Sequence, residues 1–200
     1  MTDQAASNPA LKNLFISKTR IKLLQVFFTN PGKIFYVREL VRAVNEQINA
    51  VRAELSRMEK AGMVTSEARA NRKFYGFRKD YSFFDELSRM MAKASGLGGA
   101  IIHERGKLGK IKFATLAGGY IRRYPLGASD VDLLVVGSVV LPQLAQLVKE
   151  AEEEVGREVN YTVMTEDEFA FRKNRRDPFV VGILEKPHVM LLGDEEEMSR

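Results

Sequence analysis

Two aspartates and two glycines are the residues of this 200-residue chain whose types and spacing point most directly to chemistry. Asp130 and Asp132 stand two positions apart, where an apolar run from Leu133 to Val136 begins. Because alternate side chains of a strand point to the same face, we expect the two carboxylates to lie side by side. Such a pair is costly without a positive charge between its members, and Mg²⁺ suits carboxylates plus phosphate oxygens. The pattern therefore predicts a site for a divalent metal and a phosphate.

The glycine pair Gly118-Gly119 precedes the first of these aspartates by ten intervening residues and follows an expected strand from Ile111 to Ala117. Glycines let backbone N–H groups approach phosphate oxygens closely. A short helix is expected to start at Tyr120, and a helix N-terminus also favours anions. A strand-to-helix turn without a ligand could have the same glycine pair. The pair therefore indicates a phosphate site only in combination with the carboxylates that follow it.

These two elements together resemble the polymerase-beta-like nucleotidyltransferase superfamily, particularly its minimal members, over about residues 110–164. The resemblance rests on Ala117-Gly118-Gly119, ten further residues, and Asp130-Val131-Asp132-Leu133. It implies that Asp130 and Asp132 hold Mg²⁺, that a nucleoside triphosphate binds beside them, and that a nucleoside monophosphate is transferred while pyrophosphate leaves. The nucleotide-binding residues that it implies are Gly118, Gly119, Tyr120, Arg122, Arg123 and Ser129.

The third carboxylate of the superfamily is where this sequence departs from the pattern. A helix is expected over Leu141–Glu154, and alternation predicts a strand over Gly156–Met164. The expected acid aligns with Asn160, whose neutral side chain cannot serve as a general base. Glu158 is expected on the same face and would substitute for it if the register differs by two. The candidate catalytic set is therefore Asp130, Asp132 and Glu158.

Composition narrows the chemistry further. The chain has no Cys, which excludes disulfides, thiolate zinc sites and thiol nucleophiles, and its only histidines are His103 and His188, which exclude a His-rich metal site. No apolar run approaches the ~20 residues of a membrane span, and the first residues lack a signal-peptide pattern. We expect a cytoplasmic protein.

Charge is divided unevenly along the chain. Residues 1–95 hold 17 Lys and Arg against 9 Asp and Glu, whereas residues 96–200 hold 14 against 17. A basic half joined to a mildly acidic half indicates two modules, of which the basic one faces a polyanion. The expected organisation is a flexible tail over 1–14, a first domain over 15–95, a Gly-rich linker and lead-in helix over 96–109, and a second domain over 110–200.

The first module has the sequence pattern of three helices, a hairpin and a fourth helix. The first helix is expected to begin at Lys18, with Ser17 as its N-cap. Two further helices are expected, over Arg38–Val44 and over Asn49–Lys60. A β-hairpin with the basic tip Ala68–Lys73 follows, and then a helix over Ser82–Ala94. This last helix either packs on the first one or pairs across a homodimer, since apolar spacing alone does not assign a partner.

This order is that of a winged-helix domain, and residues 15–95 resemble the arsenical-resistance-type winged-helix regulators. The resemblance includes the end of the third helix, Leu55-Ser56-Arg57-Met58-Glu59-Lys60-Ala61-Gly62. It implies binding to double-stranded DNA. The expected fold class is thus α+β, with an N-terminal winged helix-turn-helix and a C-terminal α/β nucleotidyltransferase-like domain built on a small mixed sheet.

The outward side chains of the third helix and the hairpin tip are the candidate DNA contacts. Arg pairs with guanine and Asn or Gln with adenine in the major groove, while cations on a hairpin neutralise phosphates. The base-reading candidates are Gln47, Asn49 and Arg52, the hairpin candidates are Arg69, Asn71, Arg72 and Lys73, and Arg57 suits either role. The alternatives are a solvated charged face or a protein–protein module.

The favoured function is a DNA-binding transcriptional regulator whose second domain binds Mg-nucleotide and transfers a nucleoside monophosphate if its third carboxylate is in place. The alternative is an active nucleotidyltransferase that modifies a protein or small molecule and uses the winged helix for docking. Minimal members of the superfamily also act as antitoxins, which would add a partner toxin.

Overall fold

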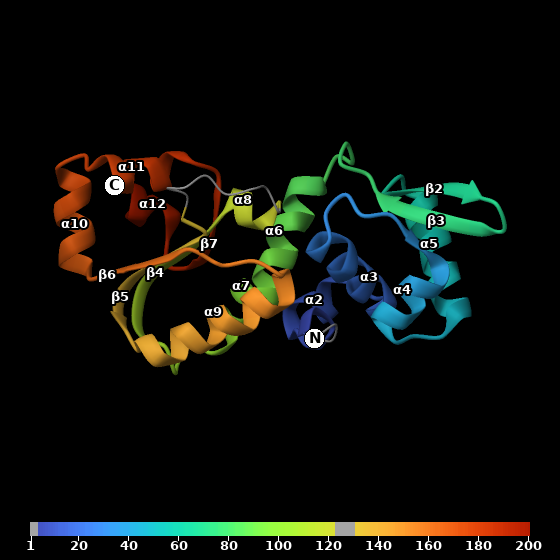
Figure 1. Cartoon of the computed structure of the whole chain (residues 1–200), viewed down its shortest axis with the longest axis horizontal. Helices are drawn as coiled ribbons and strands as arrows, with labels where there is room; N and C mark the ends of the chain where they lie inside the picture. The colour runs from blue at the N-terminus through green and yellow to red at the C-terminus, as the bar shows by residue number, and fades with distance from the viewer. Residues whose placement is uncertain (1–3, 123–130) are drawn as a thin grey trace. The chain divides into compact units, whose positions relative to one another are not determined.

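The computed structural model describes residues 4–122 and 131–200 and divides the chain into two compact units, Met1–Ser95 and Gly96–Arg200 (Figure 1). Each unit combines helices with a small sheet, so the chain is α+β as predicted. Each unit also has its own apolar core.

The first unit contains six helices and three strands among its described residues. Its helices are α1 (Gln4–Ser7), α2 (Pro9–Leu14), α3 (Lys18–Thr29), α4 (Val37–Val44), α5 (Ile48–Lys60) and α6 (Phe84–Ala94). Its strands are β1 (Phe35–Tyr36), β2 (Val64–Arg69) and β3 (Arg72–Phe77). The predicted helices and hairpin are confirmed to within a few residues of their ends.

The helices of this unit form where capping and apolar spacing direct them. The Ser17 hydroxyl accepts a hydrogen bond from the Arg20 backbone N–H, which caps α3 as predicted. Helix α5 turns Val51, Leu55 and Met58 into the core, at helical spacing. The opposite side of α5 is left exposed.

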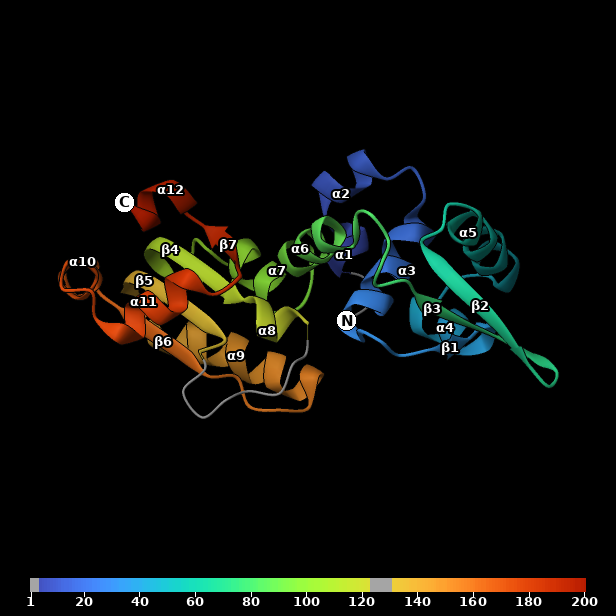
Figure 2. The ribbon, with the colours of Figure 1, turned by 90° about the horizontal axis from the view of Figure 1, so that it is seen from above.

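The strands of the first unit form an antiparallel sheet in the order β1-β3-β2. The pairing of Arg69 with Arg72 leaves only Ala70 and Asn71 in the hairpin turn, which is tighter than the predicted six-residue tip. Ala70 adopts a positive φ of 50° to close it. Figure 2 shows this turn projecting beyond the helices of the unit.

The expected flexible tail over 1–14 differs from the structure in its described part, residues 4–14. Asn8 accepts hydrogen bonds from the backbone N–H groups of Ala10 and Leu11 and so caps α2. Ala5 and Leu11 are buried in the core, and the Ala5 N–H donates to the Gln25 side chain. The apolar residues and the cap together hold this segment in place.

The second unit surrounds one mixed sheet with helices. Its helices are α7 (Gly96–His103), α8 (Gly118–Ile121), α9 (Leu141–Val155), α10 (Glu166–Asn174), α11 (Pro178–Glu185) and α12 (Glu195–Ser199). Its strands are β4 (Gly109–Ala117), β5 (Leu133–Val139), β6 (Tyr161–Met164) and β7 (His188–Leu192). The sheet order is β6-β5-β4-β7, with β5 and β6 parallel and the other pairs antiparallel. A small mixed sheet was predicted for this half of the chain.

Both faces of this sheet are covered, which explains why β5 is apolar at successive positions. Leu133 and Val135 belong to the core shared with α7 and α9, whereas Leu134 and Val136 belong to the core shared with α10 and α11. Figure 1 shows α9 on one side of the strands and α10, α11 and α12 on the other. The end of β4 and the start of β5 are thereby held between two layers of helices.

Two expectations for this unit differ from the structure. The strand predicted over Gly156–Met164 begins only at Tyr161, because the preceding backbone bonds to side chains: Val159 N–H donates to Glu152, and Asn160 N–H to Asp132. A lead-in helix was predicted within 96–109 and is present as α7, but it begins at Gly96 and so includes the Gly-rich stretch that was expected as a linker, and Leu97 and Ile101 are buried. The acidic residues near the C-terminus form α12, which Asp194 caps.

Candidate functional site

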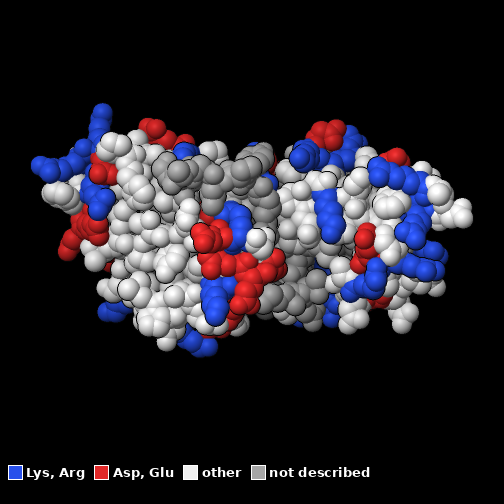
Figure 3. All heavy atoms as spheres, viewed as in Figure 1, with Lys and Arg blue, Asp and Glu red and all other residues white. Residues whose placement is uncertain are grey.

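A groove of about 640 Å³ lies in the first unit between the start of α4, helix α5 and the β2–β3 hairpin. It is lined by Tyr36, Val37, Arg38, Arg52, Asn71, Arg72, Lys73 and Tyr75. Figure 3 shows Lys and Arg side chains gathered over the part of the unit that holds α5, β2 and β3. The groove therefore combines positive charge with two aromatic rings.

Three arginines give the groove its charge. Arg38, Arg52 and Arg72 are exposed, and none of them forms an ion pair with a carboxylate among the described residues. The Arg72 guanidinium lies over the Tyr36 ring, 5.2 Å from its centre, and Arg42 donates a 2.9 Å hydrogen bond to the Tyr36 hydroxyl. Unpaired guanidinium groups around a concave surface favour phosphate oxygens.

The other cations of the hairpin are already paired. Lys73 donates to Glu59 at 3.0 Å, and this hydrogen bond, followed by one to Tyr75, raises the pKa of Lys73. The pKa of Glu59 is lowered, first by a hydrogen bond from Ser66 and then by Lys73. Arg69 pairs with Glu67 at 2.8 Å. These cations would have to leave a carboxylate before they could bind a phosphate.

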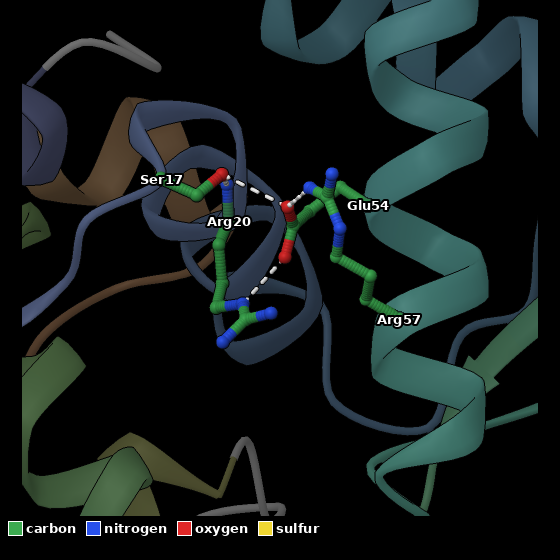
Figure 4. Close-up of polar contacts among 4 residues, drawn as sticks. All are labelled: Ser17, Arg20, Glu54 and Arg57. Carbon is green, nitrogen blue, oxygen red and sulfur yellow. Dashed lines mark hydrogen bonds and ion pairs between the residues drawn. The ribbon is translucent and has the colours of Figure 1, made fainter.

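Arg57 is also paired, through a buried carboxylate that joins two helices (Figure 4). Glu54 on α5 is 1% exposed and accepts hydrogen bonds from Arg57, from Arg20 and from the Ser17 hydroxyl. Arg20 and Ser17 belong to the start of α3. Burial would raise the pKa of Glu54, but the hydrogen bonds from Arg20 and Ser17 outweigh it and the pKa is lowered.

The predicted DNA contacts thus fall into two groups. The structure brings Arg52, Asn71, Arg72 and Lys73 together around the groove. Gln47 is the N-cap of α5, Asn49 is exposed in its first turn, and neither lines the groove; nor do Arg57 and Arg69.

Tyr36 and Arg38 line the groove but were not among the predicted DNA contacts. Arg38 lies in the first turn of α4, where the helix dipole disfavours a cation. A cation at such a position contributes little to helix stability, and this was the available signal that it serves another purpose. Tyr36 gave no comparable signal, because its ring is brought to Arg72 only by the pairing of β1 with β3.

The second candidate site lies where β4 and β5 meet in the other unit. Asp132 immediately precedes β5 and is fully buried. Arg157 donates to both of its oxygens, from Nη1 to Oδ2 at 2.9 Å and from Nη2 to Oδ1 at 3.0 Å. The backbone N–H of Asn160 donates to Oδ2 as well, at 3.1 Å. The carboxylate is therefore held by a bidentate guanidinium and one amide.

Arg157 is in turn held on two further sides. Its guanidinium lies over the Tyr120 ring, 5.3 Å from the ring centre, and its Nη1 also donates to the Glu158 carbonyl at 2.8 Å. The hydrogen bonds to Asp132 raise the pKa of Arg157, so the guanidinium stays charged. Its side chain is 26% exposed, whereas Asp132 is 0% exposed.

The two glycines have different surroundings. Gly118 donates its N–H to the Pro187 carbonyl at 2.7 Å, and a Cβ at this position would lie 2.8 Å from the same oxygen. Gly118 is thus required by the contact between β4 and the start of β7. Apart from its chain neighbours and the backbone of its own helix, no described residue lies within 4 Å of a Cβ built at Gly119.

The structure describes only some of the remaining residues that were predicted for this site. Glu158 is exposed and precedes β6. Asn160 lies beside Asp132: its carbonyl accepts from the Asp132 N–H, and its own N–H donates to the Asp132 carboxylate. Tyr120 is buried and Arg122 is exposed at the end of α8. Arg123, Ser129 and Asp130 lie outside the described residues.

Asp132 does not fit the role of a metal ligand in this arrangement. Mg²⁺ binds carboxylate oxygens at about 2.0–2.1 Å, and both oxygens of Asp132 already face a permanently charged guanidinium. Within residues 4–122 and 131–200 there is no group of three or more His, Cys, Asp or Glu side chains arranged to hold a metal ion.

No family model matches this sequence, and no curated protein or solved structure is significantly similar to it. None of the helices in the described part of the chain is both long enough and apolar enough to cross a membrane.

Proposed function

We propose that this chain is a DNA-binding transcriptional regulator whose first unit is a winged helix. The order of α3, β1, α4, α5, the β2–β3 hairpin and α6 is the order of elements in that class. In helix-turn-helix proteins the second helix of the pair enters the major groove, and α5 is the second helix of the α4–α5 pair. The exposed side of α5 carries Asn49 and Arg52, which suit base edges and phosphates.

The observation that carries this proposal is a set of three arginines around the groove that have no carboxylate partner in the described part of the chain. Arg38, Arg52 and Arg72 come from α4, α5 and β3, which are separate in the sequence but line one concavity. A cation without a carboxylate partner keeps its full charge for a polyanion, whereas a paired cation must first give up its partner. A sugar–phosphate backbone is a chain of anions that suits such a surface.

The test is the affinity of the full chain for a fluorescently labelled DNA duplex, measured by anisotropy at several salt concentrations. We expect Arg52→Ala and Arg72→Ala each to weaken binding about tenfold and to reduce the salt slope by about 1. Arg89→Ala is the matched control, because Arg89 is an exposed arginine on α6 outside the groove. Arg69→Ala should have a smaller effect than the groove variants, since Arg69 is paired with Glu67. Unchanged affinity in both groove variants would reject the proposal.

Nucleotide binding by the second unit is the other part of the proposed function. Its support is the sequence pattern at Gly118-Gly119 and the position of Arg157, whose guanidinium lies over the ring of Tyr120, the residue after Gly119. Guanidinium groups are suited to phosphate oxygens. We propose binding without transfer of a nucleoside monophosphate, because both oxygens of Asp132 accept hydrogen bonds from Arg157.

A further inference from the structure

The cluster of Asp132, Arg157 and Tyr120 has a property that the nucleotidyltransferase pattern does not include. In that pattern the aspartates attract a metal ion, which in turn faces the phosphates. Here the Arg157 guanidinium supplies the positive charge at Asp132, and its nitrogens lie 2.9 and 3.0 Å from the two carboxylate oxygens. The ion pair is inaccessible on the carboxylate side and partly exposed on the guanidinium side.

The donors of Arg157 are only partly used. A guanidinium has five N–H donors. Two donate to Asp132 and a third, on Nη1, donates to the Glu158 carbonyl. Nε and the second N–H of Nη2 have no hydrogen-bond partner among the described residues, and the side chain is 26% exposed. The group is thus fixed in orientation by a carboxylate and an aromatic ring while it keeps donors for an anion.

We infer that Arg157 is the resident cation of the nucleotide site, so that the second unit binds the phosphates of a nucleotide without a divalent metal. Asp132 then acts as a positioning residue, which orients the guanidinium and does not ligate a metal ion. The inference rests on the proposed nucleotide binding and adds to it the group that contacts the phosphates.

The first measurement is titration of the full chain with ATP by calorimetry, once with Mg²⁺ and once with EDTA. We expect the dissociation constants to agree within about twofold, because the positive charge at the site belongs to the protein. Binding that appears only with Mg²⁺, or weakens tenfold or more in EDTA, would overturn the inference while leaving nucleotide binding in place. Absence of ATP binding in both conditions would reject the nucleotide part of the proposed function and this inference with it.

Variants separate the guanidinium from the carboxylate. Arg157→Gln should weaken ATP binding at least tenfold in EDTA, whereas Arg105→Gln, at an exposed arginine of the same unit, should not change it. Because Arg157→Gln leaves Asp132 buried without its counter-ion, the double variant Asp132→Asn/Arg157→Gln provides a neutral amide pair in its place. ATP affinity that is retained in the folded double variant would contradict the assignment of Arg157.

A metal titration tests the role of Asp132 directly. The probe is Mn²⁺, followed by electron paramagnetic resonance in the absence of nucleotide. We expect Asp132→Asn to leave the Mn²⁺ binding curve unchanged, because the wild-type carboxylate is bound to Arg157. A loss of Mn²⁺ binding in Asp132→Asn would show that the carboxylate ligates metal in solution and would refute the inference.

Discussion

Glu54 and Asp132 are buried carboxylates, one in each unit, and both lie against arginine side chains. An unpaired charge in a protein interior is very costly, so each carboxylate needs hydrogen-bond donors at both oxygens. Glu54 receives them from two helices and a serine, and Asp132 from one arginine and a backbone amide. In both units, therefore, a carboxylate that the sequence alone would allow to bind a ligand is paired with an arginine of the same unit.

Replacement of Glu54 should destabilise the first unit in a pH-dependent way. We expect Glu54→Gln to lower the free energy of unfolding by about 2 kcal/mol at neutral pH, because the amide keeps one acceptor but loses the charge that Arg20 and Arg57 bind. The measurement is urea denaturation followed by circular dichroism. Glu67→Gln is the control, since the Glu67–Arg69 pair is more than half exposed on both sides and should contribute nothing measurable.

The sign of the pH dependence follows from the lowered pKa of Glu54 in the folded chain. A carboxyl group whose pKa is lower in the folded chain stabilises the fold. This contribution is fully present at pH values above the pKa of the unfolded chain, which is about 4.3, and it is lost as the pH falls through the pKa of the folded chain. The stability difference between wild type and Glu54→Gln should therefore be constant near neutrality and shrink below about pH 4. A difference that grows as the pH falls would contradict this account of the cluster.

At the scale of elements, the turn from β4 into α8 depends on one glycine and not on the other. We expect Gly118→Ala to destabilise the chain by about 1–3 kcal/mol, because its Cβ would meet the Pro187 carbonyl at 2.8 Å. Gly119→Ala, the adjacent control, should be neutral or slightly stabilising, since no described residue is within 4 Å of its Cβ. Thermal unfolding of the two variants tests this, and equal losses would refute it.

The elements that were predicted well are those whose signals are local. Ser17 caps α3 through the backbone N–H three residues further on, and the apolar stripe of α5 depends only on the spacing of its own residues. The strand predicted from Gly156 was too long because its first residues bond to Glu152 and Asp132, which lie on other elements. Alternation in the sequence does not reveal that kind of competition for backbone groups.

For the candidate sites, too, local features could be predicted from the sequence, whereas tertiary contacts could not. Composition indicated that the hairpin and α5 were basic, but which cations stay unpaired depends on Glu54, Glu59 and Glu67. The Asp132–Arg157 pair spans 25 residues of sequence and forms because the start of β5 and the segment before β6 lie side by side. Types and spacing of residues predict what chemistry is available, while tertiary pairing decides which groups remain free for it.

At the scale of the whole molecule, the two units differ in core and in charge. The first unit has a core of its own and a net charge of +8, while the second has two core clusters on the faces of its sheet and a net charge of −3. The boundary lies between Ser95 and Gly96. Under the proposed function, duplex binding is expected to belong to residues 1–95, because this unit carries the positive net charge.

Separate expression of residues 1–95 and 96–200 tests this division. We expect both fragments to unfold cooperatively, because each apolar core consists of residues from one fragment alone. Fragment 1–95 should bind a DNA duplex at least as tightly as the full chain at low salt, since the acidic unit that opposes a polyanion is gone, and the difference should fade as salt screens it. Fragment 96–200 should not bind the duplex. If fragment 96–200 binds as tightly as the full chain, or if 1–95 folds but loses affinity, duplex recognition involves the second unit and the arginine groove is not sufficient for it.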